Sequence, residues 1–236
     1  YNKCPRCIWV SMNAGWSKDM TLMMNSRLSG LIEKGLNNKR TEDCIPELPP
    51  GEILTKAVVG TGKLPLKGDA DFYIAGEYDH IARLDDGTYA VIDDKTSSVW
   101  SAEKLPPEGP ANIYSRQVNA YSYALENPAT QDWLDEIHHD DNKGKDRQPN
   151  RGGNNSHFNR IPVTTSEKIT VSRMGLNSFW FPQADLTESG TFNFSTARVW
   201  SEVEKDYDDL LERCQEIAYY TLSELEPESH KECSFC

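Results

Sequence analysis

The sequence predicts an α/β fold in which helices alternate with β-strands. Three segments have apolar residues at helical spacing, namely residues 22–36, 112–125 and 196–225. Between the first two, short apolar runs and an Asp-Gly turn are typical of strands that pair in hairpins. The 236 residues are enough for one large domain, and we expect a single domain over residues 1–236.

The first part of the chain is expected to hold a helix, a loop and two separate strands. The helix covers residues 22–36, where apolar residues recur at helical spacing. Residues 41–51 are rich in proline and acidic residues and are expected to form a loop. Residues 53–59 and 72–74 are predicted strands.

A hairpin is predicted next, and its register brings two acids together. Residues 77–84 and 88–92 flank the Asp86-Gly87 dipeptide, which is a strong signal for a tight turn. In this pairing Asp86 is the midpoint between positions 79 and 93. Asp79 and Asp93 are therefore expected to lie roughly opposite each other on neighbouring strands.

This register predicts a metal site at the end of the hairpin. Alternate residues of a strand share a face, so Lys95 lies beside Asp93 while Asp94 points away. Two close carboxylates repel each other unless a cation lies between them, and hard oxygen ligands suit Mg²⁺ or Mn²⁺. A lysine on this face can orient water or stabilise an anionic transition state. Taken alone, Asp-x-Lys fits a surface ion pair equally well.

Two helices and a polar loop are expected in the middle of the chain. Residues 105–110 break the chain, residues 112–125 form a helix, and residues 131–137 form a shorter one. Residues 139–160 are polar and low in apolar residues, which is typical of a mobile loop. The loop carries several basic residues, so it is either a solvated insertion or a segment that contacts nucleic acid.

The last third of the chain is expected to contain a hairpin and a long helix. Residues 168–176 and 178–182 are predicted to form the hairpin. Residues 196–225 have one apolar stripe at helical spacing and acidic residues on the opposite face, which predicts an amphipathic helix with one face in the core.

The charge of the chain is negative but unevenly distributed. The net charge is −12, which argues against a polyanionic partner. From Asp185 to the end there are 13 acidic and 4 basic residues, so most of the excess lies there and a basic groove elsewhere is compatible with it. There is no membrane-spanning apolar stretch and no signal-peptide pattern. The chain begins at Tyr1 without a methionine and ends on Cys236, as expected of a fragment of a longer protein.

Four of the six cysteines form CxxC pairs at the two ends of the chain. "CPRC" contains Cys4 and Cys7, and "CSFC" contains Cys233 and Cys236. Two such pairs fit a four-thiolate metal site better than a disulfide framework, although two disulfides are the alternative. Thiolate ligands favour a reducing compartment, and we expect the cytoplasm.

These motifs together resemble the PD-(D/E)XK nuclease superfamily. In "GEYDHIARLDDGTYAVIDDKTS", Asp79, Asp93 and Lys95 match the two acids and the lysine of that family. In the next helix, "SRQVNAYSYAL" places Gln117 and Tyr121 one turn apart, as in the Q-x-x-x-Y motif of the RecB-like branch. That branch includes CRISPR-adaptation exonucleases and AddB-type recombination nucleases.

The terminal cysteines also fit the RecB-like branch, many of whose members join both ends of the nuclease domain with four cysteines. The resemblance therefore implies that Cys4, Cys7, Cys233 and Cys236 hold Zn²⁺ or a [4Fe–4S] cluster. The two-plus-two division departs from the usual one-plus-three division of the iron–sulfur members. The arrangement is therefore compatible with both Zn²⁺ and a [4Fe–4S] cluster.

The chain departs from the family pattern at two further places. The residue between the second acid and the lysine is usually apolar, whereas here it is Asp94, whose main-chain carbonyl remains available as a metal ligand. A histidine often stands four residues after a glycine of the first helix, whereas Lys34 stands there and Glu33 beside it. Glu33 is either a substitute carboxylate or an ordinary solvated charge.

The resemblance implies a restriction-endonuclease-like core, with a central mixed β-sheet flanked by helices and the two ends joined by the cysteine site. It implies a metal-dependent nuclease, with DNA favoured over RNA as the substrate and exonuclease favoured over endonuclease action. Asp79 and Asp93 would bind Mg²⁺ or Mn²⁺, Lys95 would orient the attacking water, and Gln117 and Tyr121 would support the site. A helicase or a CRISPR or repair protein is the expected partner. The alternative is a non-catalytic nucleic-acid-binding or accessory module that keeps the fold.

Overall fold

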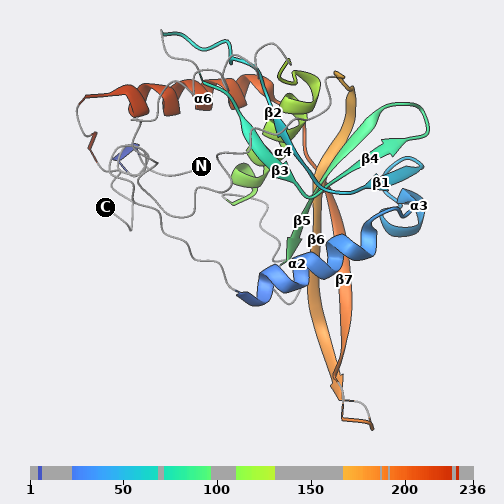
Figure 1. The fold of residues 1–236 in the computed structure, drawn as a ribbon. Helices are drawn as coiled ribbons and strands as arrows, with labels where there is room; N and C mark the ends of the chain where they lie inside the picture. The colour runs from blue at the N-terminus through green and yellow to red at the C-terminus, as the bar shows by residue number, and fades with distance from the viewer. Residues whose placement is uncertain are drawn as a thin grey trace, which may run out of the picture.

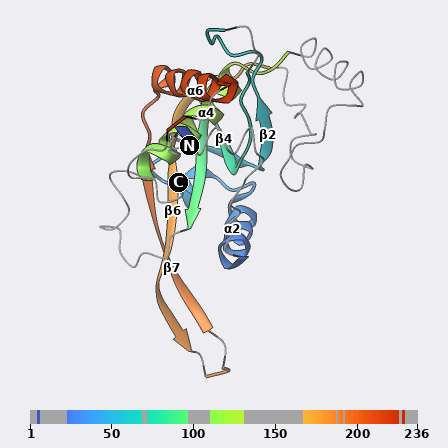
Figure 2. The same cartoon turned by 90° about the vertical axis from the view of Figure 1, so that its left-hand side faces the viewer.

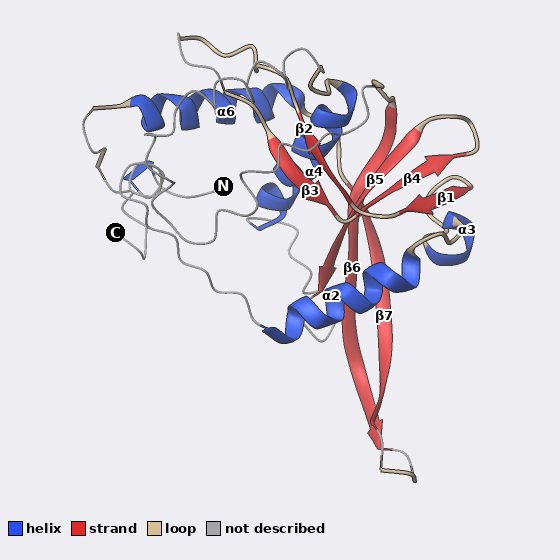
Figure 3. Ribbon diagram, in the orientation of Figure 1, coloured by secondary structure: helices blue, strands red, loops and turns tan. Residues whose placement is uncertain are grey.

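A computed structural model of the chain shows a mixed α/β fold built on a central five-stranded sheet (Figures 1 and 3). In spatial order the strands are β1 (Gly51–Leu54), β4 (His80–Leu84), β5 (Tyr89–Thr96), β6 (Val171–Leu186) and β7 (Phe192–Glu202). The structure describes residues 5–6, 23–68, 72–96, 110–130, 167–186, 188–190, 192–224 and 227–228.

The central sheet is mixed because one pair of neighbours runs parallel. β4 pairs antiparallel with both β1 and β5, β6 pairs antiparallel with β7, and β5 and β6 are parallel. A parallel pair needs a crossover connection, and helix α4 (Pro110–Glu126) lies between β5 and β6 in the chain. β2 (Ala57–Gly60) and β3 (Ala75–Tyr78) form a separate antiparallel pair.

Helices cover both faces of the central sheet. Helix α2 (Met23–Leu36) and the short α3 (Thr41–Cys44) lie on one face, where Leu36 and Ile45 pack with Ile92 of β5. Helix α4 lies on the other face, where Val118 packs with Val91. Because successive strand residues alternate between faces, β5 contributes to both cores. Helix α6 (Tyr207–Leu222) lies against α4.

The predicted β4–β5 hairpin has the expected register. His80 pairs with Ile92 and Arg83 pairs with Tyr89, so the pairing is centred on Asp86. Gly87 adopts a φ of 85°, which glycine tolerates without strain, and the Asp86 carboxylate accepts a 2.8 Å hydrogen bond from the Thr88 amide. The prediction of a strand over 77–84 was wrong in one respect, since the chain bends at residue 79 between β3 and β4.

Several boundaries in the first part of the chain differ from the sequence prediction. The predicted helix over 22–36 is confirmed as α2, whereas the predicted loop over 41–51 contains α3. The single strand predicted over 53–59 is two strands, β1 and β2, which belong to different sheets. Residues 72–74 are not in a strand, because pairing with β2 begins at Ala75.

The last third of the chain differs most from the prediction. The hairpin over 168–182 was wrong, because β6 is one strand that passes through Pro182 and pairs with β7. The ladder is irregular between Trp180 and Gln183, and such a bulge tolerates a residue without an amide hydrogen.

The long helix predicted over 196–225 was also wrong at its start. Its first residues, which are rich in β-branched and aromatic side chains, form β7 instead. The helix begins at Tyr207, because the Asp206 side chain caps it by accepting a 2.9 Å hydrogen bond from the Asp209 amide. Leu210 is buried as expected, whereas Leu222 is 56% exposed.

The β6–β7 ribbon extends well beyond the rest of the central sheet (Figures 1 and 2). Its two strands are longer than the others, and their outer part pairs Ala184 with Phe194 and Leu186 with Phe192.

Several sequence predictions lie outside the described residues. They are the chain break at 105–110, most of which is not described, the helix over 131–137, the loop over 139–160 and the four terminal cysteines. The zinc or [4Fe–4S] site therefore stays a prediction. None of the helices in the described part of the chain is long and apolar enough to span a membrane.

Candidate active site

The predicted acids and lysine meet at the end of the β4–β5 hairpin. Asp93 and Lys95 lie on one face of β5, and their Oδ2 and Nζ atoms are 2.6 Å apart. Asp79 lies at the bend before β4, and its Oδ2 accepts a 2.9 Å hydrogen bond from the Asp94 amide. The bend thus ties the first acid to the strand that carries the second acid and the lysine.

Helix α4 supplies the next layer of the site. Lys95 Nζ donates to Gln117 Oε1 at 3.3 Å, and Gln117 Nε2 donates to Tyr121 Oη at 2.8 Å. Lys95 Nζ also lies 4.7 Å from the centre of the Tyr114 ring, a cation–π distance. Gln117 and Tyr121 therefore lie on one face of α4, as their spacing predicts, and their side chains form a hydrogen-bonded chain that ends on the lysine.

Gly76 of β3 leaves room for the Tyr121 ring to lie against the β2–β3 sheet. A Cβ atom added to Gly76 would be only 2.9 Å from Cε1 of Tyr121. A side chain at position 76 would therefore push the Tyr121 ring away. Burial raises the pKa of Tyr121 to about 12, so its hydroxyl stays protonated at neutral pH.

Burial makes both acids of the site unusually basic. Asp93 is only 1% exposed, and burial raises its pKa to about 6 even though Lys95 opposes the shift and Asp79 adds to it. Burial also raises the pKa of Asp79. A carboxylate in a low-dielectric site is costly unless positive charge compensates it. The single positive charge of Lys95 does not balance the two carboxylates.

The two carboxylates fit a hard divalent cation. Within the described residues no group of three or more His, Cys, Asp or Glu side chains is placed to hold a metal ion. Mg²⁺ is commonly bound through one or two carboxylates, with water and substrate phosphate as the remaining ligands. Asp79 and Asp93 are such a donor pair, and a cation beside them would offset the cost of burying them.

Asp94 does not contribute its side chain to this face, as the alternation of strand residues predicts. Its carboxylate points to the α2 face of the sheet, because neighbouring strand residues alternate. There Oδ2 lies 2.9 Å from His80 Nδ1, and Oδ1 accepts a 2.8 Å hydrogen bond from Asn177. The polar setting that an acid needs at this position is therefore present, and only the main-chain carbonyl of Asp94 remains for the metal site.

His80 lies beside Asp94 and balances its charge when the imidazole is protonated. Its Nε2 lies 3.2 Å from the Glu33 carbonyl and its Nδ1 faces the Asp94 carboxylate, so both ring nitrogens meet acceptors. A neutral imidazole has one N–H, whereas an imidazolium has two. Burial lowers the pKa of His80, but the hydrogen bond and charge of Asp94 outweigh burial and raise it overall.

A polar chain continues from Asp94 across the sheet. The Asn177 carbonyl of β6 accepts a 3.3 Å hydrogen bond from Arg198 of β7, whose guanidinium pairs with Glu47 at 2.6 Å. Asn177 is fully buried, so these hydrogen bonds fix its side-chain amide, which in turn orients the Asp94 carboxylate. The Asp94 carboxylate is thus contacted directly from β4 and β6, and β7 supports it through Asn177.

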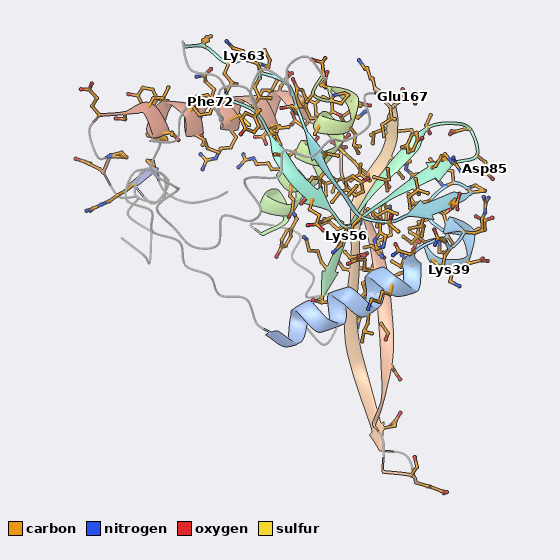
Figure 4. All side chains as sticks on the ribbon, viewed as in Figure 1. Lys39, Lys56, Lys63, Phe72, Asp85 and Glu167 are labelled. Atoms are coloured by element: carbon orange, nitrogen blue, oxygen red, sulfur yellow. The ribbon has the colours of Figure 1, made fainter. Side chains whose placement is uncertain are left out.

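Glu33 does not join the two acids in the structure. Its carboxylate lies 3.4 Å from Lys56, which also pairs with Glu77 at 3.2 Å. Lys56 lies where the chain passes from β1 to β2, at the centre of the view in Figure 4. Glu33 contributes to the site through its main-chain carbonyl, which contacts His80.

Sequence reasoning missed two residues of the site. Tyr114 is on the same face of α4 as Gln117 and Tyr121, and the three-residue spacing was a usable signal for it. Asn177 had no such signal, because it reaches Asp94 from a strand more than 80 positions along the chain.

Because the pKa of Asp93 is raised, replacing its carboxylate by a neutral side chain is expected to stabilise the fold. This gain should depend on pH. The folded state of the wild type binds a proton with a pKa of about 6 against an ordinary value of 3.8. Stability is therefore lost between pH 4 and 6 as the carboxyl ionises, and stays lower above that range. In EDTA, we expect Asp93→Asn to exceed the wild type by about 1–3 kcal/mol at pH 8 and by less at pH 4, measured by urea unfolding. An equal difference at both pH values would contradict the assignment of this charge.

Comparison with known proteins adds little to this geometry. No family model matches the chain, and no curated protein matches it. A solved structure described as "Crystal structure of SSO0001" has 12% sequence identity and a TM-score of 0.44 to this chain, with 92% of this chain and 71% of that chain covered. At this similarity the comparison carries no argument about fold or function.

Proposed function

We propose that this chain is a metal-dependent nuclease of the PD-(D/E)XK type, with its active site at Asp79, Asp93 and Lys95. The observation that carries the proposal is the nearly complete burial of Asp93 beside a second acid and a lysine. Such a cluster costs stability, and a divalent cation bound there would repay that cost. A bound Mg²⁺ or Mn²⁺ would polarise the scissile phosphate and help to ionise the attacking water.

In this proposal the residues of the active site have distinct roles. Asp79 and Asp93 hold the cation, and the Asp94 amide keeps Asp79 in place. The Lys95 ammonium, 2.6 Å from Asp93, orients the water and stabilises the negative charge that develops on the phosphate. Tyr121 and Gln117 act on Lys95 through their hydrogen-bonded chain, so they are positioning residues.

The proposal is tested by incubating the full chain with labelled single- and double-stranded DNA and RNA. Mg²⁺ or Mn²⁺ should support cleavage of at least one of them, with DNA favoured, and EDTA should abolish it. Cleavage that continues in EDTA would contradict the metal-dependent mechanism. A preference for strand ends over closed circles would identify an exonuclease.

The second candidate is a nucleic-acid-binding module that keeps the fold without turnover. Glu33 motivates it, because its pairing with Lys56 leaves the two acids without a third carboxylate in the described residues. This candidate predicts binding that weakens steeply with salt and no cleavage with any metal. The same incubation separates the two candidates.

A further inference from the structure

A cavity of about 550 Å³ lies beside the proposed active site, between α4, α6 and the chain that leads into β3. Its walls include the aromatic residues Phe72, Tyr73 and Tyr121, with Leu210, Cys214 and Ile217 of α6 opposite. Figure 4 labels Phe72, which lies beside α6. The lining is mostly apolar, and the volume lies in the range of pockets that hold small ligands.

The cavity and the active site share two walls. Gln117 and Tyr121 line the cavity, and Gln117 also accepts the hydrogen bond from Lys95 at 3.3 Å. Gln117 therefore contacts the proposed water-orienting lysine and also lines the cavity.

The charge of the lining favours an uncharged, flat group over a phosphate. The two arginines of the lining are already paired, Arg116 with Asp209 at 2.7 Å and Arg213 with Glu216. A phosphate would have to compete with these carboxylates for the guanidinium groups. An aromatic ring would instead meet Tyr121, Phe72 and apolar side chains, which suit stacking.

We propose that this cavity receives one unstacked nucleobase of the strand whose phosphate lies at Asp79, Asp93 and Lys95. The inference rests on the proposed nuclease function and adds a base-binding site to it. A base inside a duplex must leave its stack before it can enter a cavity between two helices. Recognition would be through the base face, and hence tolerant of sequence, because every base has one.

Cys214 provides a direct probe, because it lines the cavity, whereas Cys44 packs against the opposite core and serves as an internal control. The full chain would be alkylated with N-ethylmaleimide in a buffer that contains Ca²⁺. One reaction would contain a saturating thymidine decamer, and a second would contain an abasic decamer of equal charge. Labelling of the two cysteines would be read by mass spectrometry. We expect the thymidine decamer to slow alkylation of Cys214 by about tenfold and the abasic decamer to leave it unchanged.

Variants of Ala120, another residue of the cavity lining, make the test independent of the oligonucleotide backbone. Ala120→Phe should fill the cavity and remove the protection, whereas Ala120→Ser should retain it. Equal protection by both decamers, or no protection by either, would overturn the base-binding site. Cleavage without protection of Cys214 would refute this inference alone, whereas protection without cleavage in Mn²⁺ would refute the nuclease and keep the base site.

Discussion

Lys95→Ala is expected to lower the rate of cleavage by roughly a hundred- to a thousandfold, the loss typical of removing one charged stabiliser of a transition state. Lys95 lies within reach of Asp93, Gln117 and the Tyr114 ring, so three neighbours hold its ammonium at one point. Single-turnover cleavage with excess enzyme would measure the chemical step directly.

Lys56→Ala is the matched control for this variant. Lys56 also carries a positive charge near the site, but it pairs with Glu33 and Glu77 and is 48% exposed. Its removal should change the rate by less than about threefold, since an exposed ion pair contributes little. Equal losses in the two variants would mean that general positive charge, rather than the position of Lys95, supports the reaction.

Asp94→Ala is expected to destabilise the fold by about 3–5 kcal/mol, because it leaves a buried charge without its partner. The His80 side chain is 0% exposed and Asp94 supplies its counter-charge at 2.9 Å. The same substitution removes the acceptor of the Asn177 amide. Urea unfolding at pH 6 would measure the difference, and a loss below about 1 kcal/mol would contradict the buried ion pair.

The effect of Asp94→Ala should depend on pH. The pKa of His80 is raised in the fold, so its pairing stabilises the protein fully below the ordinary value of 6.5 and less as the pH rises through the folded value. The difference between wild type and variant should therefore shrink at alkaline pH. A His80→Leu, Asp94→Leu double variant should recover much of the loss, because well-packed apolar residues often replace a buried ion pair.

The hairpin and its acids could be predicted from the sequence because their geometry is local. A turn at Asp86-Gly87 fixes the register of two strands, and the register fixes which side chains share a face. The placement of Asp93 and Lys95 on one face of β5, and of Asp94 on the opposite face, followed from this alone. The contact between Gln117 and Tyr121 is equally local, being one turn of a helix.

The parts that could not be predicted depend on contacts between distant segments. β7 has an apolar pattern that also suits a helix, and only its pairing with β6 decides for a strand. The buried partners of Asp94 come from β4 and β6, so the sequence around position 94 does not indicate them. The bend at Asp79 lies between β3 and β4, which belong to different sheets, and no turn signal in the sequence marks it.

The central claim, a metal-dependent phosphodiesterase at Asp79, Asp93 and Lys95, is tested most directly by one time course. Wild-type protein and Asp93→Asn, both stripped of divalent ions, would be mixed with labelled DNA, and Mn²⁺ would be added after a baseline. Cleavage should begin in the wild type on addition of Mn²⁺, stop on addition of EDTA, and stay at least a hundredfold slower in Asp93→Asn. Equal cleavage by both proteins would contradict the claim.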